Sequence, residues 1–151
     1  MNFQQETLFD VVNEVDELLK LHYEELTMNK EHIKLEPMWD EYASLERMNR
    51  FVLYTARDNG VLVGYSAFFV MPHMHYASTR LAVNDVLFLH PDYRKSTCGF
   101  KFIKYADEML AESGLVDKII WHVKYSLDWS NVLHKLGYAD EEKVVGKIIR
   151  K

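Results

Sequence analysis

Apolar residues recur at helical spacing near the start of the chain. Thr7 precedes this pattern with Asp10 three residues later, an arrangement typical of the capping box that begins a helix. The apolar positions that follow share one helical face: Leu8, Val11, Val12, Val15, Leu18, Leu19 and His22. The pattern predicts one amphipathic helix over this stretch, preceded by a short strand at residues 2–5. A shorter helix is predicted at residues 39–48, after a break at Pro37.

Three extended segments are predicted in the middle of the chain: residues 51–57, 62–71 and 80–89. The Asn59-Gly60 pair between the first two is typical of a tight hairpin turn. Pro72 is expected to end the second strand, because proline has no N–H to donate to a ladder. Residues 73–79 then form a loop or a long hairpin end. The three segments predict a meander of strands.

The third of these strands leads directly into a loop and a helix. An apolar run at residues 86–89 is followed by Pro91, a polar loop at residues 94–98 and an amphipathic helix predicted from Gly99. The first-turn amides of a helix have no intrahelical partners, and the helix dipole favours negative charge there. Three basic side chains lie around the loop: Arg94, Lys95 and Lys101. The segment therefore predicts a site for a phosphate-bearing ligand.

The last third of the chain is predicted to hold a strand, a helix and another strand. Gly114 ends the preceding helix, and alternating apolar residues favour a strand at residues 118–125. Asp128 is placed to cap a helix that ends at Gly137, and residues 144–149 are predicted to form a final strand. The strand–helix–strand unit should be a right-handed parallel crossover in an otherwise largely antiparallel sheet. The order of elements predicts a mixed α/β sheet with helices on both faces.

Composition and charge narrow the classes of partner. With 151 residues, 48% of them apolar and 27% charged, the chain has the size and content of one globular domain. The net charge of −5 argues against nucleic-acid binding and mildly favours a cationic partner. No apolar run approaches the roughly 20 residues that span a bilayer, so no membrane association is expected. The first ten residues have no basic segment followed by an apolar one, so we expect no secretory signal. Cys98 is the single cysteine, and we therefore expect a cytoplasmic protein.

Element order over nearly the whole chain resembles the GCN5-related N-acetyltransferase (GNAT) family, most sharply at residues 86–110 and 131–138. In that family the central strand ends near a proline, before a loop of the form Arg/Gln-x-x-Gly-x-Gly/Ala. Arg94, Thr97 and Gly99 fall on the three motif positions. Thr97 replaces the usual glycine, at a steric cost if the position needs a positive φ. The resemblance implies one domain over residues 1–151, with a mostly antiparallel sheet of six to seven strands flanked by about four helices.

The resemblance also implies that acetyl-CoA is the cosubstrate. Backbone groups of Phe88 and Leu89 would pair with the pantetheine arm, and an N–H near Leu89 would polarise the thioester carbonyl. The implied cofactor-binding residues are Phe88, Leu89, Arg94, Lys95, Ser96, Thr97, Cys98, Gly99, Phe100, Lys101 and Asn131. No metal is expected, because His73 and His75 have no cysteine or carboxylate cluster beside them.

For proton transfer, Asp85 falls where members of the family often carry a carboxylate on the central strand. Such a carboxylate can take a proton from an amine through water if burial raises its pKa, although a local hydrogen-bonding role is the alternative. The family's acid is commonly a tyrosine four residues before the glycine that ends the last helix, and here that position is Leu133. His134 and Tyr138 are the remaining candidates. Direct transfer is the commoner family mechanism, and a covalent acetyl-cysteine at Cys98 is the alternative.

The predicted acceptor is an amine on a small molecule or a protein: a lysine side chain, a protein N-terminus, a polyamine or an aminoglycoside. Acidic and aromatic residues that suit a cationic amine are Glu24, Glu25, Glu31, Glu36, Asp40, Glu41, Trp39, Tyr42 and Tyr76. A solvated acidic helix face is the alternative for these carboxylates. Leu133 and Thr97 leave a second hypothesis, an inactive module that binds CoA or a protein partner in a regulatory role. The sequence also allows a homodimer, in which exposed apolar residues such as Phe68, Phe69 and those of the final strand would form the interface.

Overall fold

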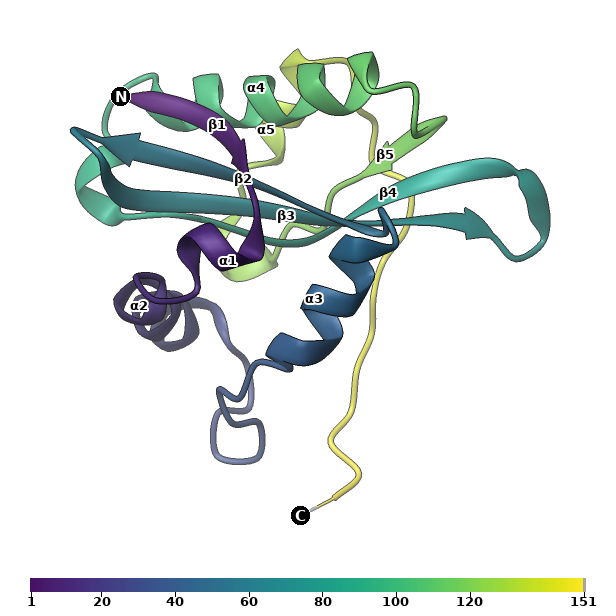
Figure 1. The fold of residues 1–151 in the computed structure, drawn as a ribbon. Coiled ribbons are helices and arrows are strands. Elements are labelled where there is room, and N and C mark those ends of the chain that lie inside the picture. Colours follow the sequence, from purple (N-terminus) through teal and green to yellow (C-terminus); the bar gives the residue numbers. More distant parts are fainter. Residues whose placement is uncertain (151) are drawn as a thin grey trace.

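A five-stranded sheet forms the middle layer of the computed structural model, and its strands follow the order of the chain (Figure 1). The structure describes residues 1–150. The strands are β1 Asn2–Glu6, β2 Phe51–Asp58, β3 Val61–His73, β4 Tyr76–Leu89 and β5 Lys118–Ile120. Neighbouring strands are antiparallel except β4 and β5, which are parallel. The predicted mixed, mostly antiparallel sheet is confirmed.

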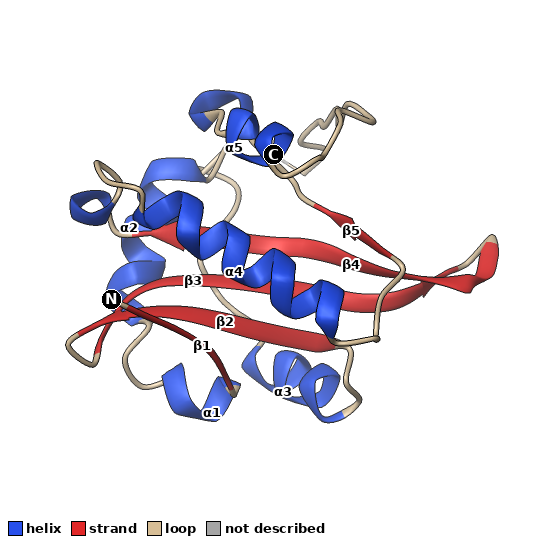
Figure 2. Ribbon diagram, turned by 90° about the horizontal axis from the view of Figure 1, so that it is seen from above, coloured by secondary structure: helices blue, strands red, loops and turns tan. Residues whose placement is uncertain are grey.

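Helices cover both faces of this sheet (Figures 1 and 2). One face carries α1 Leu8–Val11, α2 Asp16–Leu26 and α3 Trp39–Arg47, and the other carries α4 Cys98–Glu112 with α5 Ser130–Lys135 beside it. Each face has its own apolar cluster, and the neighbours Phe88 and Leu89 belong to different clusters because side chains alternate along a strand. Phe68, expected as an exposed dimer contact, is instead fully buried. No helix within residues 1–150 is long and apolar enough to cross a bilayer.

The predicted first helix consists of two helices, so the chain has five α-helices in the described residues and not about four. Thr7 caps α1 through the predicted capping box with Asp10. The chain turns after α1, and this turn lets Glu14 pair with Arg57 of β2 while Val15 stays buried. One continuous helix was a wrong prediction, because the spacing of apolar residues does not reveal a turn that keeps them on the same side.

The two hairpins of the meander differ in length. Asn59 and Gly60 close the first with φ of 47° and 85°, the left-handed geometry that a two-residue turn requires. The second strand does not end at Pro72, as predicted, but continues through it. Phe51 of β2 pairs with Phe69, so β3 has no neighbour on that side at Pro72, and a missing N–H costs no ladder bond there. β3 and β4 therefore extend beyond the sheet as a long arm (Figure 2).

Two predicted strands near the C-terminus are short or missing. β5 contains only Lys118–Ile120 of the predicted strand at residues 118–125, and residues 144–149 form no strand. Val145 and Ile149 are 84% and 81% exposed, and the segment runs away from the sheet as extended chain (Figure 1). The prediction of six to seven strands is thus wrong. A strand needs a neighbour to pair with, and an apolar local pattern does not provide one.

Candidate active site

The second half of β4 has one unpaired edge. Its parallel pairing with β5 ends at Val83 and Ile120, whereas β4 continues to Leu89 beside β3 alone. The His90 N–H donates a 2.8 Å hydrogen bond to the Val63 carbonyl of β3. Because backbone groups alternate in direction along a strand, those of Leu89 point to the unpaired edge. An extended ligand can lie along this edge.

A β-bulge at Asp85 lies within this half of the strand. Val86 pairs with Ala67 and Asn84 pairs with Phe68, which leaves Asp85 as an extra residue between them. Asp85 and Val86 therefore face the same side of the sheet, and both line one pocket. The Asn84 side-chain amide donates to the carbonyls of Ala67 and Val86, at 3.2 and 3.0 Å, and thereby holds the bulge.

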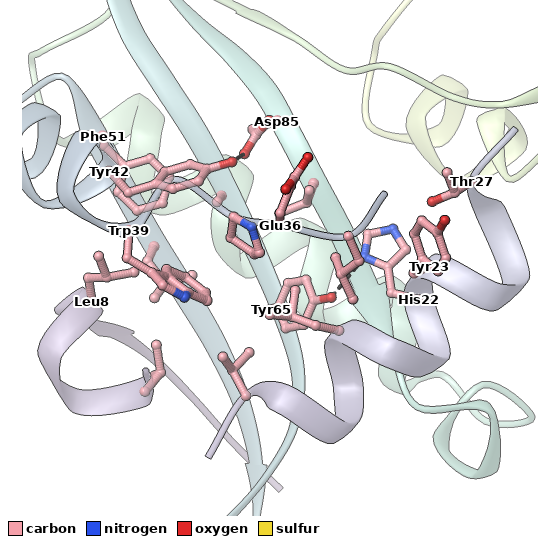
Figure 3. Close-up of a pocket in the computed structure, with 18 of the residues that line it drawn as sticks. Leu8, His22, Tyr23, Thr27, Glu36, Trp39, Tyr42, Phe51, Tyr65 and Asp85 are labelled. Atoms are coloured by element: carbon pink, nitrogen blue, oxygen red, sulfur yellow. Dashed lines mark hydrogen bonds between the residues drawn. The ribbon is translucent and has the colours of Figure 1, made fainter. Parts of the chain in front are cut away.

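The pocket has a volume of about 380 Å³ and lies between the sheet and the helices α1, α2 and α3 (Figure 3). Buried apolar side chains form much of its wall: Leu8, Val11, Val15, Leu53 and Leu62. Nine of the 22 lining side chains carry an acidic, basic, hydroxyl or imidazole group: His22, Tyr23, Thr27, Lys34, Glu36, Tyr42, Tyr65, Asp85 and Lys124. Apolar walls with a few placed polar groups are the usual form of a small-molecule site.

Asp85 is the pocket carboxylate held by a neighbouring side chain. Its Oδ2 accepts a 2.8 Å hydrogen bond from the Tyr42 hydroxyl of α3. Burial raises the pKa of Asp85, and the hydrogen bond from Tyr42 and the nearby His122 only partly oppose this rise. A carboxylate with a raised pKa in a pocket is suited to accept a proton from a ligand.

His22 and Tyr65 form a second polar pair in the pocket, which the sequence did not indicate as part of a site. Nδ1 of His22 lies 2.8 Å from the Tyr65 hydroxyl, and the imidazole stacks on Phe88 with 5.0 Å between ring centroids. Burial lowers the pKa of His22 to about 4, and Lys124 adds to this effect. His22 is therefore neutral at physiological pH. The available signal was a single histidine on an otherwise apolar helical face.

The loop at residues 94–97 precedes α4, which begins at Cys98, one residue earlier than predicted. Thr97 is the N-cap residue with φ of −73°, so the position needs no glycine, and its side chain caps no backbone N–H. The Cys98 N–H donates to the Ser96 hydroxyl at 3.2 Å. Gly99, Phe100 and Lys101 occupy the first turn. The helix end thus keeps N–H groups for a ligand, beside the exposed Lys95.

Comparison with known families agrees with this geometry. The model of the acetyltransferase (GNAT) family matches residues 15–138. The chain belongs to the GNAT family. It is thus an acyltransferase by family, and the resemblance stated from its sequence is confirmed. The family uses acetyl-CoA as its acetyl donor. No curated protein matches the chain significantly.

Solved structures with the GNAT fold align with almost the entire chain. An aminoglycoside acetyltransferase from an uncultured soil metagenomic sample, solved with sisomicin, has a TM-score of 0.71 and 15% identity over 99% of this chain and 95% of that one. Ribosomal-protein-alanine N-acetyltransferase from Brucella melitensis biovar Abortus 2308 has a TM-score of 0.66 and 18% identity over 100% of both chains. A predicted acetyltransferase from Clostridium acetobutylicum, solved with acetyl-CoA, has a TM-score of 0.69 and 16% identity over 98% and 96%. At these identities the likeness shows the fold alone.

Arg94, the first residue of the GNAT loop motif, is turned toward the end of β4. Its Nε donates to the Leu89 carbonyl at 2.6 Å, and its Nη1 lies 2.8 Å from a carboxylate oxygen of Glu25 on α2. The guanidinium carbon lies 5.1 Å from the centroid of the Phe88 ring. Arg94 therefore ties α2 to the strand end, and Glu25 balances its charge.

Cys98 is buried in the apolar cluster under α4, together with Leu89 and Phe102. Burial raises the pKa of its thiol, which keeps the sulfur protonated. An activated nucleophilic cysteine has the opposite property, a lowered pKa. This environment gives the covalent acetyl-cysteine alternative no support.

The two acid candidates lie outside the pocket lining. His134 is exposed on α5, where its Nε2 lies 2.8 Å from Asp140. The Tyr138 hydroxyl donates to a carboxylate of α4, on the opposite face of the sheet. Leu133, which stands at the family's tyrosine position, is buried, and Asn131 is an exposed residue of α5. This geometry does not bring the last helix to the pocket.

Three of the residues expected to bind the acceptor amine line the pocket: Glu36, Trp39 and Tyr42. The pocket lining does not include Glu24, Glu25, Glu31, Asp40 or Glu41. Tyr76 lies at the end of the β3–β4 arm, where its ring packs with those of His73 and His75. Across residues 1–150, no group of three or more histidine, cysteine or acidic side chains is placed to hold a metal ion.

Proposed function

We propose that this chain transfers an acetyl group from acetyl-CoA directly to a primary amine, with Asp85 as the general base. The position of Asp85 carries the proposal: its carboxylate stands at the bulge of β4, where the unpaired strand edge meets the pocket. Burial raises the pKa of Asp85, which suits a base that works near neutral pH. Two structurally similar proteins are named for amine acceptors, an aminoglycoside and a ribosomal-protein alanine, which supports this acceptor class.

The chain offers groups that fit acetyl-CoA. The unpaired edge of β4 presents the Leu89 N–H to an extended pantetheine arm. The Leu89 carbonyl already accepts a hydrogen bond from Arg94. The first turn of α4 offers backbone N–H groups to a pyrophosphate, with Lys95 and Lys101 as positive charges and the Thr97 hydroxyl as a donor. When bound, acetyl-CoA supplies the thioester that reacts with the amine.

Asp85, held by Tyr42, accepts the proton that the acceptor amine loses. A protonated amine has no lone pair for attack, so it must lose a proton first. Asp85 takes this proton, directly or through a water, while the 2.8 Å hydrogen bond from Tyr42 holds the carboxylate. Burial and the hydrogen bond to Asp85 raise the pKa of Tyr42, so this tyrosine stays a donor.

One observation favours a second candidate function, a module that binds CoA or a protein partner without turnover. Leu133 replaces the family's tyrosine, and its hydrocarbon side chain has no proton to give to a departing thiolate. Tyr42 and Tyr65 line the pocket, but both hydroxyls already have partners. The Tyr42 hydroxyl donates to Asp85, and the Tyr65 hydroxyl lies at hydrogen-bonding distance from His22. Such a module would keep the unpaired edge of β4 for CoA and would not catalyse acetyl transfer.

Thermal shift with CoA and acetyl-CoA, followed by thiol release against a panel of primary amines, tests the proposal. We expect both ligands to raise the Tm, because each binds only the folded chain, and at least one amine to release thiol. Stabilisation without turnover on any amine would favour the binding module. No stabilisation by either ligand would contradict both acetyl transfer and a module that binds CoA.

A further inference from the structure

We infer that the acceptor is a primary monoamine with an apolar body, aromatic or aliphatic, rather than a polycation. This inference rests on the proposed function, since it names the substrate class of the same pocket. It differs from the expectation drawn from acidic residues in the sequence, which favoured lysine side chains, polyamines and aminoglycosides alike.

The pocket wall is the first argument. Sixteen of the 22 lining side chains are apolar or aromatic: Leu8, Val11, Val15, Leu19, Tyr23, Ile33, Leu35, Pro37, Trp39, Tyr42, Phe51, Leu53, Leu62, Tyr65, Ala67 and Val86. Several of them belong to the apolar cluster under α1 and α2, so the pocket is continuous with the core. The aliphatic side chains of this wall cannot hydrogen-bond hydroxyl or additional amino groups, and the Tyr42 and Tyr65 hydroxyls already have partners in Asp85 and His22. Burying those groups there without partners costs free energy.

The charge balance of the pocket is the second argument. Its lining holds two carboxylates, Glu36 and Asp85, and two lysines, Lys34 and Lys124, so the formal charges of these four side chains cancel. Two acidic residues of α2 that would attract a polycation pair elsewhere, Glu24 with Lys30 and Glu25 with Arg94. A ligand with three or more ammonium groups therefore meets only two carboxylates, and the two lysines leave no excess negative charge to attract it.

The arrangement of the polar groups is the third argument. Asp85 and Tyr42 form one polar pair beside the β4 bulge, and Trp39 and Tyr65 stand around the same space (Figure 3). One ammonium group next to Asp85 would gain an ion pair and contact with aromatic faces. The rest of the ligand would lie against leucine and valine side chains. The pocket thus matches a single amino group joined to an apolar body.

A matched series of acceptors tests this directly. Thiol release is measured with propylamine, butylamine, pentylamine, hexylamine and 2-phenylethylamine, and with spermidine, kanamycin and a lysine-containing peptide. We expect kcat/KM to rise roughly threefold to fourfold for each added methylene, as for burial of a CH₂ group. We also expect 2-phenylethylamine to exceed spermidine and kanamycin by at least about tenfold.

A pocket-filling variant localises the effect. Leu19→Trp fills the wall of the pocket and should raise the KM for 2-phenylethylamine, whereas Leu21→Trp changes an exposed residue of the same helix that does not line it. Calorimetry measures the binding of 2-phenylethylamine in the absence of acetyl-CoA and so gives a readout that is independent of turnover. This binding should weaken in Leu19→Trp and persist in Leu21→Trp.

The outcomes separate the two proposals. If spermidine, kanamycin or the peptide is the best acceptor, or if the alkylamine series is flat, the apolar-monoamine inference is overturned and acetyl transfer stands. If no amine releases thiol but 2-phenylethylamine binds and Leu19→Trp weakens the binding, the ligand class is supported and the proposed function fails. If neither turnover nor binding is detected, both fail.

Discussion

The Tyr42 hydroxyl donates a 2.8 Å hydrogen bond to Oδ2 of Asp85 and so joins α3 to the bulged residue of β4. The Tyr42 ring is itself held by Phe51 and Phe69, with 5.0 and 5.9 Å between ring centroids. Burial raises the pKa of Asp85, and this hydrogen bond lowers it by a smaller amount. Tyr42 thus both positions the carboxylate and limits the rise of its pKa.

Replacing Asp85 by asparagine should remove the base while keeping the side-chain shape. We expect kcat/KM for acetyl transfer to fall on the order of 100-fold or more, as for loss of a general base. The variant should also lose the Asp85 ionisation from its pH–rate profile. An unchanged pH–rate profile would exclude Asp85 as the base. Asp40→Asn, which changes an exposed acidic residue of α3 outside the pocket lining, is the matched control.

The same substitution should not cost stability at neutral pH. A carboxyl whose pKa is raised by folding contributes its full stability below its unfolded pKa and loses that contribution as the pH rises through its folded pKa. At pH 7, above the unfolded pKa of an aspartate, the wild type has lost part or all of this contribution, whereas the asparagine side chain has no ionisation and loses nothing. The Tm of the variant at pH 7 is expected to equal or exceed that of the wild type. A markedly lower Tm would mean that the charge is stabilising.

Tyr42→Phe should move the pH dependence without removing the base. Loss of the hydrogen bond removes an interaction that lowers the pKa of Asp85. The acid limb of the kcat/KM profile is thus expected to shift to higher pH. Tyr125→Phe provides the control, because Tyr125 is 81% exposed. A shift to lower pH, or equal profiles for both variants, would contradict the tuning role.

The lysines around the start of α4 should affect CoA binding. In Lys95→Ala/Lys101→Ala we expect the Kd for CoA to rise on the order of tenfold, with a weaker dependence on salt. Lys104→Ala removes a lysine from the next turn of the same helix, where it pairs with Glu108 at 2.9 Å. Calorimetry at two salt concentrations compares the variants. An equal loss of CoA affinity in the double variant and in Lys104→Ala would indicate that only the overall charge of the protein matters.

Gly64 allows the close approach of β3 to the end of β4. A Cβ at this position would lie 2.9 Å from the Phe88 carbonyl oxygen and from Cδ1 of Leu89. Gly64→Ala should therefore lower the free energy of unfolding by about 1–3 kcal/mol and weaken CoA binding, because Leu89 must move. Gly146→Ala, whose Cβ would meet nothing within 4 Å, should leave both unchanged. Denaturant unfolding and CoA calorimetry check the pair.

Much of the fold follows from local patterns. The capping box at Thr7, the Asn59-Gly60 turn and the apolar face of α4 are local signals, and each of these three features is present as predicted. The errors concern non-local events: the turn between α1 and α2, the passage of β3 through Pro72 and the lack of a partner for residues 144–149. Each depends on which segment lies beside another, and periodicity carries no information on that.

We could infer the family and the strand–loop–helix segment at residues 86–110 from the sequence alone, and the family resemblance then drew attention to the Asp85 carboxylate. The surroundings of that carboxylate depend on how the helices pack on the sheet. Tyr42 and His22 come from helices far away in the chain, and they reach the pocket because α2 and α3 pack on the same face of the sheet. Burial, pKa and the charge of a pocket are sums over such neighbours, so they arise only when the chain is folded.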